Sequence, residues 1–176
     1  PYQIASHSQG SSIKVNGREI MEMNPSEIRS IRGDLISMIF QEPMTSLNPY
    51  QKVGTQIEEM LIIHKGMNKK QAKQRVLTLL EKVKIPEPEL KANSYPHQLS
   101  GGQRQRIMIA MALSNDPDLL IADEPTTALD VTVEKSLLEL LKDLQLQTGM
   151  SILFITHDLN IVKKFADEVC VMKDGE

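Results

Sequence analysis

The chain has 176 residues and a hydrophobic content of 40%, enough to bury one sizeable core, which favours one globular domain or a large part of one. Its formal net charge of −3, from 20 basic and 23 acidic residues, gives no general attraction for nucleic acid or an anionic membrane surface. The longest apolar run, Ile107 to Leu113, is far shorter than the roughly 20 residues of a membrane-spanning helix. We therefore expect no nucleic-acid partner and no segment here that crosses a membrane.

The first expected element is a β-hairpin. Asn16-Gly17, a dipeptide that tolerates the positive φ angles of a two-residue turn, separates two short runs that suit strands. A short helix should follow, because Asn24 stands at an N-cap position and Glu27 completes a capping box. This helix is expected to end near Gly33.

A buried strand is expected over residues 35–40, and it delivers Gln41 to a loop at its carboxyl end. The middle third is predicted to be helical. Asn68 and Gln71 form a second capping pair, and apolar residues then recur at helical spacing until the prolines at 86 and 88 close the segment.

In the last third, apolar runs at 119–122, 152–155 and 169–172 alternate with helical patterns, the longest at 133–144. Such alternation predicts a parallel sheet with crossover helices. The single cysteine, Cys170, should then be a buried strand residue in a reducing, cytosolic compartment. Ligands of open parallel sheets bind at the carboxyl ends of the strands, where we expect the chemistry.

Two carboxylates, Asp123 and Glu124, directly follow the first of these runs. P-loop nucleotide hydrolases present acids in this way, one to the magnesium ion of the nucleotide and the next to the attacking water. Asp123 would orient a magnesium-bound water, and Glu124 would position, or take a proton from, the water that attacks the γ-phosphorus. A strand that merely ends in solvated acids would show the same pattern.

Leu99-Ser100-Gly101-Gly102-Gln103 precedes an apolar helical run. Glycines allow close approach to the backbone, and a helix N-terminus attracts anions by about 0.3–1 kcal/mol. The pattern therefore indicates a phosphate site, although an ordinary N-cap turn could also begin with these residues.

This pentapeptide resembles the signature motif of ABC ATPases, and the resemblance extends over essentially the whole chain. Gln41 is similar to the Q-loop glutamine of that family, Asp123-Glu124 to its Walker B pair, residues 127–130 to its D-loop, and His157 to its switch histidine. Five motifs in family order are highly specific. The fold that the resemblance implies is α/β, with a mainly parallel P-loop NTPase-like sheet at residues 1–42 and 116–176 and an inserted helical subdomain at 43–115.

Residues 40–49 and 95–98 are similar to the branch that serves oligopeptide and dipeptide importers. The implied function is an ATP-binding and ATP-hydrolysing motor subunit that imports peptides or related small solutes. A soluble ABC ATPase of DNA repair, chromosome organisation or translation is an alternative, but many of those carry long insertions, whereas the interval from Gln41 to Leu99 suits a compact subdomain. A non-hydrolysing binding module is disfavoured because Glu124 and His157 are both present.

The resemblance also implies cofactors and partners: ATP, Mg²⁺, a second ABC ATPase domain as homodimer, heterodimer or tandem copy, and transmembrane permease subunits at the cytoplasmic face of the membrane. Membrane contact would occur only through the permease. The implied site residues are Glu124, His157 and Gln41 for catalysis, Asp123 and Gln41 for Mg²⁺, Ser100, Gly101, Gly102 and Gln103 for a nucleotide bound in trans, Asp130 for coupling within the dimer, and Glu42, Met44, Leu47 and Asn48 for the permease.

No Gly-x-x-x-x-Gly-Lys-Ser/Thr sequence, the Walker A motif that cradles the β- and γ-phosphates, occurs in the 176 residues. We expect the sequence to begin after that motif and the 176-residue chain to be inactive alone.

Overall fold

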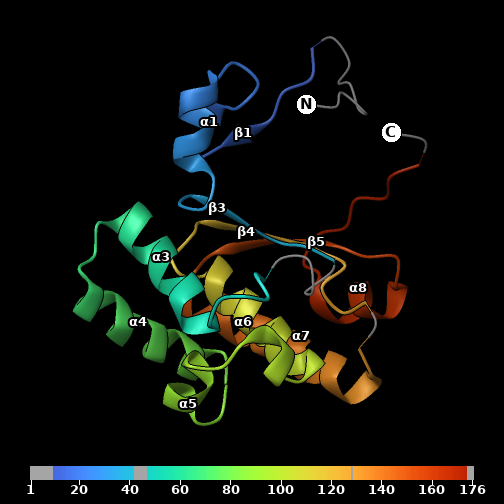
Figure 1. Ribbon diagram of the computed structural model, residues 1–176. Helices are drawn as coiled ribbons and strands as arrows, with labels where there is room; N and C mark the ends of the chain where they lie inside the picture. The colour runs from blue at the N-terminus through green and yellow to red at the C-terminus, as the bar shows by residue number, and fades with distance from the viewer. Residues whose placement is uncertain (1–9, 42–46, 128, 174–176) are drawn as a thin grey trace. The chain divides into compact units, whose positions relative to one another are not determined.

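The computed structural model describes residues 10–41, 47–127 and 129–173. The chain divides into two compact units, Pro1–Arg32 and Gly33–Glu176, which are considered separately (Figure 1).

The described part of the first unit contains the expected hairpin and helix. Strands β1 (Lys14–Val15) and β2 (Arg18–Glu19) pair in antiparallel fashion, and Asn16 and Gly17 between them have φ angles of 49° and 75°. Positive φ at both central positions is what a type I′ hairpin turn requires. Helix α1 (Pro25–Ile31) begins after Asn24, whose side chain and that of Glu27 form the predicted capping box.

The second unit contains a parallel sheet. Strands β3 (Ile36–Ile39), β4 (Leu119–Asp123) and β5 (Ser151–Ile155) lie in the order β3-β4-β5, and both pairings are parallel. This arrangement confirms the α/β class and the strands expected near 35–40, 119–122 and 152–155.

Helices connect the strands and lie against one face of the sheet (Figure 1). The second unit contains α3 (Val53–Lys65), α4 (Lys69–Lys82), α5 (Pro88–Ala92), the 3₁₀ turn η1 (Pro96–Gln98) and α6 (Gly101–Ala112) between β3 and β4, α7 (Val131–Thr148) between β4 and β5, and α8 (Leu159–Phe165) after β5. The segment that contains α3 to α6 thus connects β3 and β4, which are neighbours in the sheet.

Capping explains where α4 begins, since Asn68 and Gln71 form the predicted capping box. The sequence predicts that Pro88 closes the helical segment, but in the structure Pro88 begins a further short helix. It occupies the first turn of α5, where proline is accepted because its missing N–H would have no partner within the helix.

The core lies between the sheet and these helices. On α7, Leu137, Leu140, Leu141 and Leu144 are buried at helical spacing, and Ile107 and Ile109 of α6 are fully buried. Leu120 and Ala122 of β4 are also fully buried, whereas their neighbour Ile121 is only partly buried. The core therefore packs on one face of β4 and holds its carboxyl end in place.

The strand expected at 169–172 is wrong. These residues have no regular secondary structure, Val169, Val171 and Met172 are 61%, 80% and 74% exposed, and Cys170 is exposed as well. A strand needs a partner for its backbone hydrogen bonds, and in the described part of the chain β5 pairs with β4 but not with this run.

The division into a core at 1–42 and 116–176 and a helical subdomain at 43–115 stays a prediction. None of the helices in the described ranges has the length and apolar character of a membrane-spanning segment.

Candidate nucleotide-binding and hydrolytic site

The carboxyl ends of the three strands bring the predicted polar residues to one edge of the sheet. Ile39 of β3 is opposite Ala122 of β4, so Gln41 and Glu124 each lie two residues beyond a matched pair. Asp123 is opposite Ile155 of β5, which places His157 two residues beyond that pair. The register thus gathers residues that are 83 and 33 positions apart in the sequence.

Glu124 is the centre of this group. Its Oε2 accepts hydrogen bonds from Gln41 Nε2 at 3.0 Å and from Thr127 Oγ1 at 2.9 Å. Its Oε1 lies 3.0 Å from His157 Nδ1. The Glu124 side chain is 26% exposed and that of His157 is 81% exposed, so the carboxylate is held by three neighbours while the imidazole still faces solvent.

The pKa of Glu124 is lowered from its ordinary value. The hydrogen bond with His157 is the largest cause, and the hydrogen bond from Thr127 is the second. Both favour the charged form. Glu124 is therefore an ionised acceptor at neutral pH, which suits a group that holds a water molecule by hydrogen bonding.

The backbone of Glu124 is unusual, with a φ of 42°. Few residues other than glycine adopt positive φ, and Pro125 restricts the residue before it still further. Such strain is common at functional sites and persists only where surrounding contacts hold it. One such contact is the hydrogen bond of 3.0 Å from the Glu124 N–H to the carbonyl of Ile155.

The oxygen atoms at this edge fit a magnesium ion shared with a nucleotide. Mg²⁺ takes oxygen ligands and is usually bound through one or two carboxylates together with substrate phosphates. Asp123 supplies a carboxylate, and the Gln41 amide bonds Glu124 through nitrogen, so its carbonyl oxygen is not the atom engaged there. Among the described residues, no group of three or more His, Cys, Asp or Glu side chains could hold a metal ion alone.

Residues 99–103, hereafter the signature turn, begin helix α6. Ser100 is the N-cap: its Oγ accepts from the Gln103 N–H at 3.3 Å, and the Gln103 side chain accepts from the Ser100 N–H at 3.1 Å. The ordinary N-cap geometry is thus present. It leaves the Ser100 hydroxyl proton available to donate, because Oγ is the acceptor in this bond.

The two glycines of the signature turn differ in their surroundings. A Cβ on Gly102 would lie 3.1 Å from Val133 Cγ1, so Gly102 allows α6 to approach α7 closely. A Cβ on Gly101 would meet nothing within 4 Å. Packing within the described chain therefore explains Gly102 but not Gly101, and the open side at Gly101 is where a ligand could approach the backbone.

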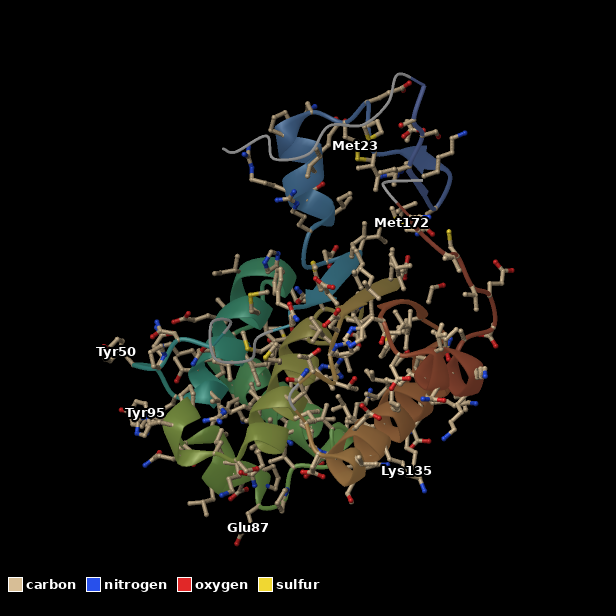
Figure 2. All side chains as sticks on the ribbon, turned by 90° about the vertical axis from the view of Figure 1, so that its right-hand side faces the viewer. Met23, Tyr50, Glu87, Tyr95, Lys135 and Met172 are labelled. Carbon is tan, nitrogen blue, oxygen red and sulfur yellow. The ribbon has the colours of Figure 1, made fainter. Side chains whose placement is uncertain are left out.

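The remaining predicted site residues lie elsewhere. Asp130 is the N-cap of α7 and accepts from the N–H groups of Thr132 and Val133 at 3.1 and 3.0 Å. Asn48 is exposed and accepts from the Tyr50 N–H, and Tyr50, 89% exposed, projects outward in Figure 2.

Leu47, predicted to contact the permease, is only 2% exposed and belongs to the hydrophobic core. That prediction needs correction for its side chain, because burial of the apolar group stabilises the fold and removes it from the surface. Glu42 and Met44 lie outside the described residues.

Sequence reasoning missed the role of Thr127 as a hydrogen-bond donor to Glu124. It was assigned only to the D-loop motif, yet its hydroxyl is one of the three groups that hold Glu124. Its position three residues after Glu124 was an available signal, because a threonine three residues further round a tight turn can donate back to the first side chain.

Comparison with known proteins gives the family. The sequence profile described as "ABC transporter" matches residues 3–127, more than half of the chain. The chain belongs to the ABC transporter family. It is 58% identical over 176 residues to the peptidoglycan transport ATP-binding protein YejF of Agrobacterium fabrum, covering 100% of this chain and 32% of that protein.

Two oligopeptide transport ATP-binding proteins named OppD are also similar to this ABC chain. The identity is 54% with the Bacillus subtilis protein, covering 93% of this chain and 46% of that one. It is 51% with the Salmonella typhimurium protein, covering 94% and 50%. The chain therefore spans 32–50% of the length of these curated relatives.

Solved structures of the ATP-binding cassette MJ0796 share the fold. A dimeric post-hydrolysis state of that protein, bound to ADP and Pi, has a TM-score of 0.72 and 34% identity, covering 84% of this chain and 62% of the other. A second dimeric structure has a TM-score of 0.74 and 32% identity, covering 86% and 65%.

Proposed function

We propose that the complete subunit hydrolyses ATP and that Glu124 positions, or takes a proton from, the attacking water. The observation that carries this proposal is the Glu124 carboxylate, ionised and held by Gln41, Thr127 and His157 at the carboxyl edge of the parallel strands. A fixed acceptor costs little reorganisation during the reaction, which is how preorganised groups accelerate it.

The neighbouring residues have complementary roles in this proposal. Bound ATP and its magnesium ion supply the γ-phosphoryl group and a positive charge that stabilises it. Asp123 and Gln41 bind the ion through oxygen. His157 engages Glu124 through Nδ1, which carries the proton of that bond because the ionised carboxylate can only accept. With the exposed ring protonated, Nε2 would donate a second hydrogen bond to the γ-phosphate. The cluster thus orients water and phosphate from the same edge.

A second copy of the domain completes the site. Ser100, Gly101, Gly102 and Gln103 would contact the nucleotide bound by the partner, and Asp130 would link the two sites. The open space beside Gly101 supports an approach from outside the chain, and the similar MJ0796 cassette is described as dimeric. Binding of the nucleotide across an interface explains why neither the signature turn nor Asp130 is among the side chains that hydrogen-bond the Glu124 carboxylate.

We expect the 176-residue chain to release no phosphate from ATP in the presence of Mg²⁺. It contains no Walker A sequence, whose backbone and lysine are the main phosphate contacts of P-loop proteins. Phosphate release should be measured beside the complete subunit at equal concentration. Turnover by the 176-residue chain that is lost in its Glu124→Gln variant would contradict this expectation.

We further propose that the subunit drives import of peptides or related small solutes, at the cytoplasmic face of the membrane and through permease subunits. The support is the identity of 51–58% with proteins named for oligopeptide or peptidoglycan transport. The same names disfavour the soluble ABC ATPase. In this proposal Asn48, with Glu42 and Met44, contacts the permease, and residues 43–115 form the helical subdomain that carries this surface.

Reconstitution tests the importer proposal. The complete subunit, its permease and its solute-binding protein should take up a labelled oligopeptide into proteoliposomes when ATP is supplied on the side of the subunit. The same complex with Glu124→Gln is the matched control and should bind ATP without uptake. ATP hydrolysis that no peptide stimulates, with no uptake of any member of a peptide library, would contradict the importer proposal and leave the hydrolytic one standing.

A further inference from the structure

A buried glutamine of helix α6 reaches the turn that carries Glu124. The side-chain amide of Gln105 donates a hydrogen bond of 2.6 Å to the backbone carbonyl of Pro125, and Gln105 is only 1% exposed. Buried polar side chains normally have such partners, because an unpaired amide in the interior destabilises the fold. Since Pro125 follows Glu124 directly, this bond ties the turn to α6.

The turn depends on contacts from outside it. The positive φ of Glu124 before a proline is unfavourable in isolation, so neighbouring elements must hold it. From the side of β5, the carbonyl of Ile155 accepts from the Glu124 N–H. Within the turn, the Thr127 N–H donates to the Glu124 carbonyl at 3.1 Å. Gln105 supplies the contact from α6.

Gln105 lies on the same helix as the signature turn. Helix α6 begins at Gly101, so Gln105 is about one helical turn further along. At the start of the helix, α6 packs closely against α7, because Gly102 has no side chain to separate it from Val133. A shift of the helix N-terminus would therefore move the donor that holds the Pro125 carbonyl, because a single helical turn transmits displacement as a rigid unit.

We propose that Gln105 is a positioning residue that couples the signature turn of one subunit to Glu124 of the same subunit. This inference rests on the hydrolytic role proposed for Glu124. Gln105 touches no reacting atom. It sets the position of the Glu124 turn relative to the helix that meets the partner's nucleotide, so occupation of the signature turn is communicated to the carboxylate through one hydrogen bond.

The test is Gln105→Met in the complete subunit, which keeps the length and volume of the side chain but removes the donor. Without nucleotide, the backbone amides of Glu124, Thr126 and Thr127 should exchange with deuterium faster than in the wild type, because the turn loses a support. With ATP, kcat should fall about 10–100-fold, the effect of a small misplacement of a reacting group. The affinity for ATP should not change, since Gln105 does not contact the nucleotide.

Gln56→Met is the matched control. Gln56 is also a buried helical glutamine, 6% exposed, and donates to the carbonyls of Asn48 and Gln51 at 3.0 Å each. Its loss should speed exchange near residues 48–56 and leave both the exchange of 124–127 and permease-independent kcat at wild-type values. Gln105→Asn provides a second variant, because it keeps a polar amide that is too short to reach Pro125.

Wild-type exchange at 124–127 in both Gln105 variants would overturn the inference. So would an equal change at these residues in Gln56→Met, because the effect would then be general loss of stability. The exchange measurement needs no turnover, so it remains decisive even if Glu124→Gln retains hydrolysis and the proposed function fails.

Discussion

Replacement of Glu124 by Gln in the complete subunit should lower the rate of ATP hydrolysis by about 10²–10⁴-fold, the usual contribution of a positioned acid–base group. The contacts of Glu124 predict that the fold survives. An amide oxygen can accept from Gln41 and Thr127, and the amide nitrogen can donate to the neutral ring of His157. What is lost is the negative charge that holds or deprotonates water.

Nucleotide binding should therefore persist while turnover falls, and ATP-bound dimers should accumulate. Phosphate release, equilibrium binding of a fluorescent ATP analogue and size-exclusion chromatography measure the three properties. Glu139→Gln, at an exposed position of α7, is the control for removal of one carboxylate and should behave as wild type. Wild-type turnover by Glu124→Gln, or failure to form dimers with ATP, would refute the assigned role.

The largest effect on stability is expected for Leu140→Ala. Leu140 is fully buried on α7, and removal of a buried leucine side chain lowers the free energy of unfolding by about 2–5 kcal/mol, because apolar burial is lost and a cavity remains. Urea unfolding of the complete subunit, followed by circular dichroism, would measure this loss.

Leu146→Ala provides the comparison within the same helix. Leu146 is 76% exposed, so the same chemical change should alter the free energy of unfolding by no more than about 0.5 kcal/mol. Equal losses for the two variants would mean that α7 does not pack against the sheet through the face that contains Leu140.

Local signals in the sequence predicted much of the fold because each acts over a few residues. Asn16-Gly17, Asn24 and Asn68 each determine a turn or a helix start through their own backbone and side-chain hydrogen bonds, and the structure has these features where they were expected. The gathering of Gln41, Glu124 and His157 at one edge of the sheet was also predictable, since parallel strands bring their carboxyl ends to the same edge.

Features that depend on distant parts of the chain were less accessible. The run 169–172 has strand-like residues but no described strand pairs with it. Leu47 is predicted to contact the permease, yet tertiary packing buries its side chain. The contact between Gln105 and Pro125 joins residues 20 positions apart, and nothing in the local pattern of α6 distinguishes this glutamine from one that faces solvent.

The left-handed backbone at Glu124 has a consequence for how this chain could be stabilised. Glycine adopts such a φ at little cost, so the backbone conformation at position 124 suits glycine better than glutamate. Selection for thermal stability alone would therefore favour the loss of the carboxylate that the proposed reaction requires. At this position, retention of function and relief of conformational strain oppose each other.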